Sequence, residues 1–159
     1  MTSVFRYTAK PTFRDLHGRF VRAERALLEI RRDEMRAEGR RFVEIAQSLA
    51  PGGAGHTVAK QIGFQTFVQA DAVGFKTQTG PIARYHIFGT GIYGPRGRVI
   101  RPTSKKVLHF FISGAEFFRP SVKGIKPNRF MSDAYRQWLP GAEAAMRRIA
   151  TRYKAELKG

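Results

Sequence analysis

This 159-residue chain has no cysteine, and its 12 Asp and Glu stand against 29 Lys and Arg. Without cysteine the chain forms no disulfide, offers no thiolate to a metal and has no cysteine nucleophile. No uncharged run reaches the roughly 18 apolar residues that a membrane span requires. Residues 1–15 also lack the apolar core of a signal peptide. We therefore expect a soluble protein made in the cytoplasm.

The shortage of acids is greatest in the middle of the chain. Residues 12–49 hold nine Arg and seven acids, whereas residues 50–132 hold twelve Lys and Arg against only Asp71 and Glu116, a net charge of +10 (twelve minus two). Such a field favours nucleic acid, an anionic membrane or an acidic protein. Charge alone does not choose among these partners, or between binding and solubility.

The N-terminal third of the chain carries a long helical pattern. Apolar residues recur at spacings of three and four over 12–50, which predicts a helix that ends before Pro51. The stripe slips in phase between Asp33 and Gly39, so we expect a bend or break there. The stripe also predicts that three side chains are buried: Phe20, Leu27 and Phe42.

The rest of the chain alternates between strand and helix patterns. Two hairpins are predicted, at 61–79 with a turn at 71–72 and at 106–122 with a turn at Ser113-Gly114. Pro81 suits the start of a short helix over 81–88. The remaining expected elements are a short edge strand at 3–9 and helices at 127–138 and 140–157.

Together these patterns predict one domain, 1–159, of the α+β class. A long N-terminal helix would pack on a small, mainly antiparallel β-sheet. The β-rich core is expected at 57–126, with a long projecting loop at 89–106, and the C-terminal helices at 127–157.

The segment Gly89 to Gly94, "GTGIYG", spells the G-x-G-x-x-G of a dinucleotide-binding loop. That loop works only between a buried strand and a helix that starts within it. The preceding "ARYHIF" is too polar for a central strand, and Pro95 stops a helix from continuing. We therefore predict no nucleotide cofactor.

Catalytic and metal-binding patterns are also missing. The histidines at 17, 56, 86 and 109 share no local spacing with carboxylates. The central region has too few acids for a carboxylate pair, and Gly-x-Ser-x-Gly is absent. We predict no enzyme activity, no catalytic residue, no metal site and no cofactor.

A basic loop with interleaved aromatic residues remains. Its composition is that of a groove for single-stranded nucleic acid, and equally that of a protein–protein arm. The residues predicted to form an interface are Tyr85, Phe88, Gly89, Thr90, Gly91, Tyr93, Arg96, Arg98, Arg101, Lys105 and Lys106.

Four segments occur in an order that resembles the HK97 gp10-like family of tailed-phage neck and tail-completion proteins. They are "IAQSLAPGGAGHTVAKQI", Tyr85-His86-Ile87-Phe88-Gly89-Thr90, "VIRPTSKKVLHF" and "KGIKPNRFMSDAYRQWL". The resemblance implies a structural virion protein that forms a ring at the head–tail junction, joins the connector to the tail and lets DNA pass. It also implies assembly in the host bacterial cytoplasm.

The resemblance suggests several partners. They are other copies of the chain in a six- or twelve-fold ring, phage connector or head-closure proteins, and tail-terminator or tail-tube proteins. Non-specific contact with passing double-stranded DNA is also expected, whereas contact with a membrane is not. The alternative is a basic nucleic-acid-binding protein.

The predicted loop would act as an arm between subunits. Gly89 and Gly91 would let the backbone turn outward, and Arg96, Arg98 and Arg101 would meet carboxylates of a neighbour's long helix, with DNA as the second choice. The expected carboxylates are Glu24, Glu29, Glu34 and Glu38.

Overall fold

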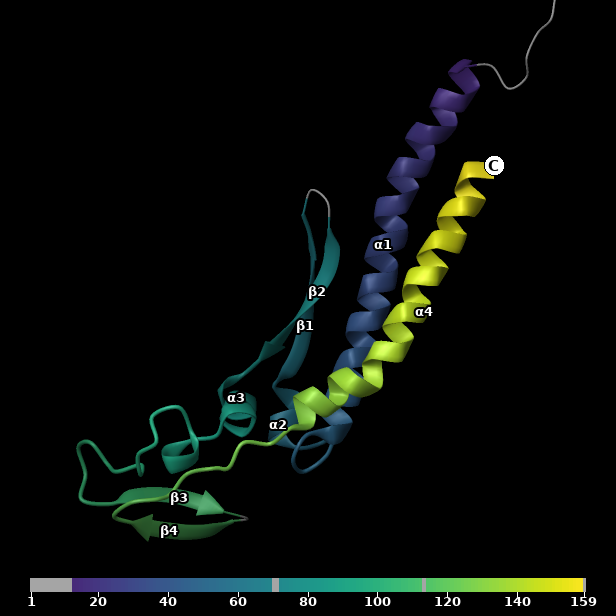
Figure 1. Cartoon of the computed structure of the whole chain (residues 1–159). Helices are drawn as coiled ribbons and strands as arrows, with labels where there is room; N and C mark the ends of the chain where they lie inside the picture. Colours follow the sequence, from purple (N-terminus) through teal and green to yellow (C-terminus); the bar gives the residue numbers. More distant parts are fainter. Residues whose placement is uncertain (1–12, 70–71, 113, 159) are drawn as a thin grey trace, which may run out of the picture.

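Two long antiparallel helices form the body of the molecule, and a smaller lobe extends from one end of them (Figure 1). The computed structural model describes residues 13–69, 72–112 and 114–158. The helices are α1, Phe13–Leu49, and α4, Phe130–Lys158. The α+β class expected from the sequence is confirmed, while the edge strand expected at 3–9 lies outside the described residues.

The predicted break in the long helix is wrong. Helix α1 is nevertheless continuous from Phe13 to Leu49. Its buried positions Ile30, Glu34, Glu38 and Phe42 follow one another at intervals of four, so burial moves gradually around the helix without a break. Glu34 and Glu38 lie on the buried face, but they are not apolar, so the apolar pattern did not predict that the buried face passes through them.

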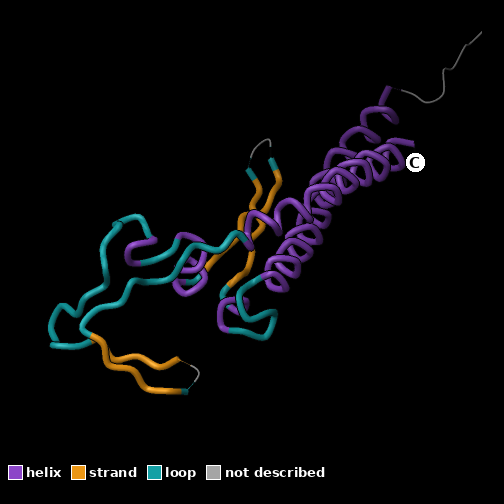
Figure 2. The backbone as a smooth tube through the Cα atoms, turned by 60° about the horizontal axis from the view of Figure 1, so that its bottom comes forward, coloured by secondary structure: helices purple, strands orange, loops and turns teal. Residues whose placement is uncertain are grey.

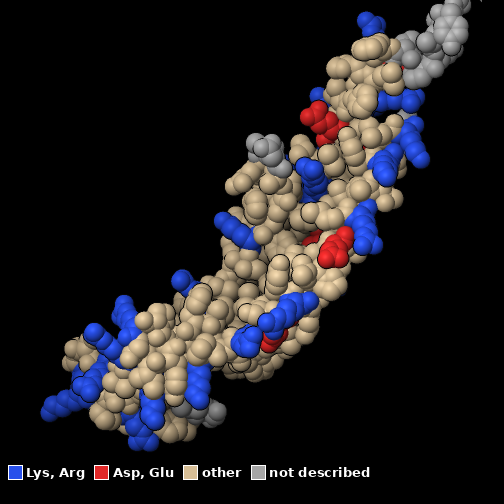
Figure 3. Space-filling view, viewed as in Figure 1, with Lys and Arg blue, Asp and Glu red and all other residues tan. Residues whose placement is uncertain are grey.

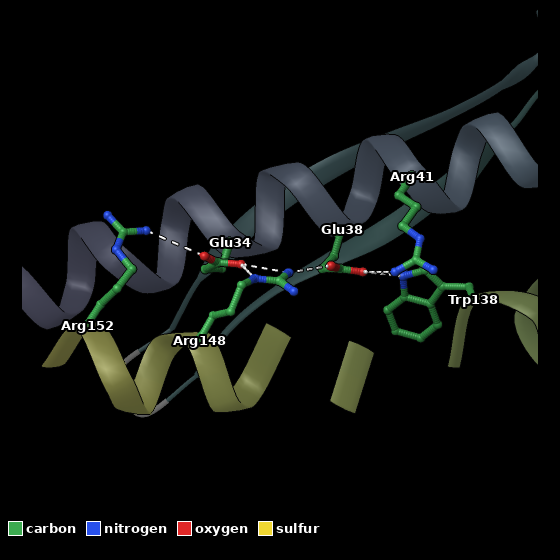
Figure 4. Close-up of polar contacts among 6 residues, drawn as sticks. All are labelled: Glu34, Glu38, Arg41, Trp138, Arg148 and Arg152. Atoms are coloured by element: carbon green, nitrogen blue, oxygen red, sulfur yellow. Dashed lines mark hydrogen bonds and ion pairs between the residues drawn. The ribbon is translucent and has the colours of Figure 1, made fainter. Parts of the chain in front are cut away.

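Both buried glutamates are held by side chains from α4 (Figure 4). The Arg148 guanidinium donates to Glu34 through Nε at 3.0 Å and to Glu38 through Nη2 at 2.9 Å, and the Trp138 indole N–H donates to Glu38 at 2.9 Å. Hydrogen bonds first to Glu34 and then to Glu38 raise the pKa of Arg148 above the ordinary arginine value. Arg152 also pairs with Glu34, at 3.5 Å.

The prediction for Phe20 is also wrong. Phe42 is buried, as expected, and Leu27 is half-buried, but Phe20 is 60% exposed. Helix α1 extends past the end of α4 (Figure 1), so its first turns have no helix beside them. The apolar stripe there is real, but it has no partner within the described part of the chain.

The two expected C-terminal helices form one, since α4 runs through Pro140. Proline removes one backbone hydrogen bond from a helix and usually kinks it. Here Ala134, Gly141 and Ala145 are buried on either side of Pro140, and α4 packs along α1, so both halves are held in place. Gly141 leaves room for the Arg41 guanidinium, which a Cβ at that position would strike.

The first predicted hairpin is confirmed as β1, Ile62–Val68, and β2, Val73–Thr79, which pair antiparallel. It packs against α1. The Phe75 ring lies edge-on to the Trp138 ring, with centroids 5.5 Å apart, and its centroid is 6.1 Å from that of Phe42. This aromatic contact joins both long helices and the hairpin in one core. The four-residue helix α2, Thr57–Lys60, closes the end of the core with Val58 and Ala59 fully buried.

Residues 81–129 form what we call the distal lobe. It contains α3, Pro81–Phe88, the short 3-10 helix η1, Gly91–Tyr93, and the hairpin of β3, Leu108–Ile112, and β4, Ala115–Arg119. Within the residues that the structure describes, the four strands thus form two separate two-stranded antiparallel sheets (Figure 2).

Helix α3 connects the distal lobe to the core. The Gln61 side-chain oxygen accepts from the backbone N–H groups of Ile82 at 2.8 Å and Ala83 at 3.2 Å, which caps the first turn of α3. At the other end, the Asn128 N–H donates to the His86 carbonyl at 2.7 Å. Helix α3 is therefore also fixed to the segment that leads into α4.

We expect Phe42→Ala to lower the free energy of unfolding by about 3 to 5 kcal/mol, because it empties a buried aromatic site. Phe20→Ala is the matched control in the same helix, and we expect a change within about 0.5 kcal/mol since the side chain is exposed. Denaturant melts of both variants measure the difference. Equal losses would contradict the assignment of the buried face.

Arg148→Ala removes hydrogen bonds from both buried glutamates, and we expect it to lower the thermal midpoint of unfolding. Buried carboxylates that lose a partner are destabilising. Arg147→Ala, one residue away, is the control because the Arg147 guanidinium has no carboxylate partner in the described chain. Calorimetry should show the larger decrease for Arg148→Ala, and a similar decrease for both would refute the role of the network.

Candidate functional site

The glycine-rich loop is held against a second stretch of the distal lobe. The Thr90 N–H donates to the Ile125 carbonyl at 2.9 Å, and the Ile125 N–H donates back to the Thr90 hydroxyl at 2.9 Å. The Ile92 N–H donates to the Lys123 carbonyl, also at 2.9 Å. The start of the predicted arm is thus anchored by backbone hydrogen bonds.

The glycines have two roles in this contact. Gly89 and Gly91 have φ of 74° and 63°, in the left-handed region that favours glycine. A Cβ on Gly91 would strike the Lys123 carbonyl, and a Cβ on Gly124, where φ is 96°, would strike the Thr90 carbonyl. The expected turn is present. The close approach of the two segments is a second reason for glycine at these positions, and the sequence did not reveal it.

The local frame of a dinucleotide site is not formed at this loop. Helix α3 precedes it where a buried strand is required, and only the three residues of η1 are helical within it. The G-x-G-x-x-G spelling therefore belongs to a turn whose backbone lies against residues 123–125.

An open cleft of about 930 Å³ lies between α3 and the loop that follows it. Its walls bring together most of the predicted interface residues: Tyr85, Phe88, Gly89, Thr90, Gly91, Arg96, Arg98 and Arg101. Tyr85 and Phe88 are 51% and 58% exposed. The cleft is therefore lined by arginines and by aromatic side chains that the fold leaves uncovered.

Three predicted residues lie outside this cleft lining: Tyr93, Lys105 and Lys106. The ammonium of Lys126 lies 5.5 Å from the Tyr93 ring centroid in a cation–π contact. Arg84 belongs to the same basic and aromatic stretch of the sequence, although it is not among the predicted interface residues, and it lines the cleft from α3.

A second, largely apolar hollow adjoins the cleft and shares Tyr85, Thr90 and Ile100 with it. Its further lining comes from β3 and from the returning segment: Phe110, Val122, Lys123, Gly124 and Ile125. The bridge between Ile100 and Val122 closes the loop onto this segment. Sequence reasoning missed residues 122–125, because their place in the site depends on contacts across the lobe.

Lysine and arginine side chains are spread over the visible face of the distal lobe (Figure 3). Glu116, the only acid in residues 81–129, pairs with His109 at 2.7 Å. Within the described residues, none of the Arg and Lys side chains of the lobe forms an ion pair. The arginines of the cleft keep their hydrogen-bond donors available for an external anion.

The carboxylates expected to receive these arginines in a neighbouring copy are mostly committed elsewhere. Glu34 and Glu38 are buried between α1 and α4, so that part of the prediction is wrong. Glu29 pairs with Arg32 of its own helix at 2.7 Å. Of the four expected acceptors, only Glu24 forms no ion pair in the described chain.

Comparisons with protein-family models, curated proteins and solved structures found no match to this chain. Among the described residues, no three His, Asp or Glu side chains are grouped so as to hold a metal ion. None of the described helices is both long and apolar enough to cross a membrane.

Gly91→Ala should loosen the anchored loop, because a Cβ there meets the Lys123 carbonyl. Gly97→Ala is a close control: Gly97 has a similar φ of 59°, but a Cβ there has nothing within 4 Å. Both changes introduce backbone strain of about 1 kcal/mol or more, and only Gly91→Ala adds a clash. We expect faster hydrogen exchange at Thr90 and Ile92 in Gly91→Ala alone. Equal exchange in the two variants would contradict this account of the turn.

Proposed function

We propose that this chain is a non-enzymatic structural protein of a tailed-phage virion. It assembles into a closed ring at the head–tail junction, joins the connector to the tail and lets DNA pass. The order of the four sequence segments that resemble the neck and tail-completion family supports this proposal. The observation that carries it is the uncovered surface of the distal lobe, where aromatic and arginine side chains gather without partners.

Apolar side chains are exposed at both ends of this elongated subunit. Phe13 and Phe20 lie at the free end of α1 and are 91% and 60% exposed, while Phe111 and Phe118 in the distal hairpin are 64% and 52% exposed. A two-stranded hairpin is only marginally stable by itself. We propose that a neighbouring copy covers the Phe111 and Phe118 face, in a head-to-tail contact of the kind that closes rings.

The predicted interface residues keep their proposed role in assembly. The lobe that carries them, from Tyr85 to Lys106, would face other copies, the connector or the tail proteins. With Glu34 and Glu38 buried, the long helix of an identical subunit offers the lobe fewer carboxylates than the sequence led us to expect.

The second candidate is a basic nucleic-acid-binding protein. It is favoured by the unpaired cations of the distal lobe, since clustered Lys and Arg bind the phosphates of a polyanion by releasing counterions. A binder of this kind loses affinity steeply with salt, whereas rings closed by apolar contacts persist in salt.

Purified protein, treated with nuclease and kept in high salt, should form closed rings of uniform mass in negative-stain images and light scattering. Phe111→Ser combined with Phe118→Ser should shift the mass toward the monomer, because it removes both exposed aromatic rings from this face of the hairpin. Met146→Ser is the control, since this side chain on α4 is 63% exposed but remote from the lobe. A chain that stays monomeric up to its solubility limit, alone and with connector protein, would contradict the proposal.

A further inference from the structure

The cleft of the distal lobe presents cations from two walls. Arg84 projects from α3, while Arg96, Arg98 and Arg101 belong to the loop opposite. All four are exposed, and none pairs with a carboxylate of the described chain. Like charges that converge without acids repel one another. The site is therefore suited to an anion that contacts several guanidinium groups at once.

Exposed aromatic rings lie beside these cations. Tyr85 and Phe88 are three residues apart on α3, so they share one face of the helix. More than half of each residue is exposed, and both line the cleft. Aromatic rings next to arginines provide stacking surfaces for unpaired bases, and the guanidinium groups reach the backbone phosphates.

The composition of the whole lobe favours nucleic acid over an acidic protein. The cores of protein–protein interfaces are depleted in lysine, yet Lys105, Lys106, Lys123 and Lys126 lie around the lobe with no carboxylate partner in the described residues. A phosphodiester chain, with one charge per nucleotide, interacts favourably with every exposed cation. The spread of positive charge over the lobe in Figure 3 fits this kind of ligand.

The position of the aromatic rings separates single strands from duplexes. Tyr85 and Phe88 line the cleft, where a rigid duplex with its bases already stacked gives them nothing to stack on. A single strand has free base faces and enough flexibility to follow a concave surface. We propose that this cleft binds single-stranded nucleic acid, with the four arginines on phosphates and the bases on Tyr85 and Phe88.

This site goes beyond the proposed structural role and can be tested separately from it. Ring assembly is tested above through Phe111 and Phe118 of the hairpin, neither of which lines the cleft. Rings without strand binding would refute the cleft proposal alone, and strand binding by a chain that forms no rings would refute the neck proposal alone.

The experiment measures fluorescence anisotropy of a labelled thymidine oligonucleotide of about 20 nucleotides, and of a duplex of equal length, over a range of salt. The intact chain should prefer the single strand. The triple change Arg96→Gln, Arg98→Gln and Arg101→Gln should weaken its binding by about tenfold or more. It should also reduce the slope of log affinity against log salt by about 2, since each lost phosphate contact contributes roughly 0.7.

The matched control carries the same change in net charge on the helical body: Arg25→Gln, Arg40→Gln and Arg147→Gln. These arginines are exposed and have no carboxylate partner in the described chain. We expect the control to weaken single-strand binding by less than about threefold. Equal losses in the two triple variants would overturn the proposal, because diffuse charge alone would then account for binding.

A second variant tests the aromatic wall. Tyr85→Leu with Phe88→Leu keeps apolar side chains but removes both rings, and should weaken single-strand binding by about fivefold or more while leaving duplex binding unchanged. Circular dichroism checks that every variant is folded. The proposal fails if single-strand binding is absent or no tighter than duplex binding. It also fails if the variant without the aromatic rings of Tyr85 and Phe88 binds the single strand as tightly as the intact chain does. Displacement of the strand by polyglutamate more effectively than by unlabelled oligonucleotide would likewise refute it.

Discussion

Two carboxylates buried between the long helices set the arrangement on which the other elements depend. Glu34 and Glu38 point from α1 toward α4, and a buried carboxylate without partners is strongly destabilising. Arg148 and Trp138 can reach both carboxylates only in one axial register of α4 along α1. Polar pairing therefore favours one register between two helices whose apolar contacts, many of them alanines, would permit sliding.

The fixed register determines where the distal lobe stands. Trp138 donates to Glu38 and also packs on Phe75, so the hairpin β1–β2 is joined to the same point on the helix pair. Gln61, just before β1, then caps the first turn of α3. A chain of contacts thus runs from the glutamates to the cleft. The helix that carries Arg84 and Tyr85 is held at its first turn by the core.

The fold also divides the charge of the molecule. Most acids of the chain lie on the helix pair, where Glu29, Glu34 and Glu38 among others are paired with nearby arginines. The distal lobe keeps its cations and has Glu116 alone, which His109 engages. Little intramolecular compensation is left for the lobe. Its charge is therefore available to an anionic partner, such as an acidic protein surface or the phosphates of a nucleic acid.

Local patterns in the sequence determined most elements, because their causes lie within a few residues. Apolar spacing predicted α1, alternation predicted both hairpins, and Pro81 marked the start of α3. Two further predictions also came from local patterns: that the glycine loop is no nucleotide site, and that residues between Tyr85 and Lys106 form an interface. These features follow from side-chain periodicity and backbone chemistry.

Only the tertiary structure decided the features that depend on a partner distant in sequence. Glu34 is polar, so the apolar pattern predicts that the buried stripe ends before it. Its burial is possible because Arg148, more than a hundred residues away in sequence, donates a hydrogen bond to its carboxylate. Phe20 continues an apolar stripe, yet α4 ends too early to cover it. Packing against α1 holds α4 together across Pro140. Backbone contacts with residues 123–125 hold the start of the predicted projecting loop, which forms one wall of a cleft.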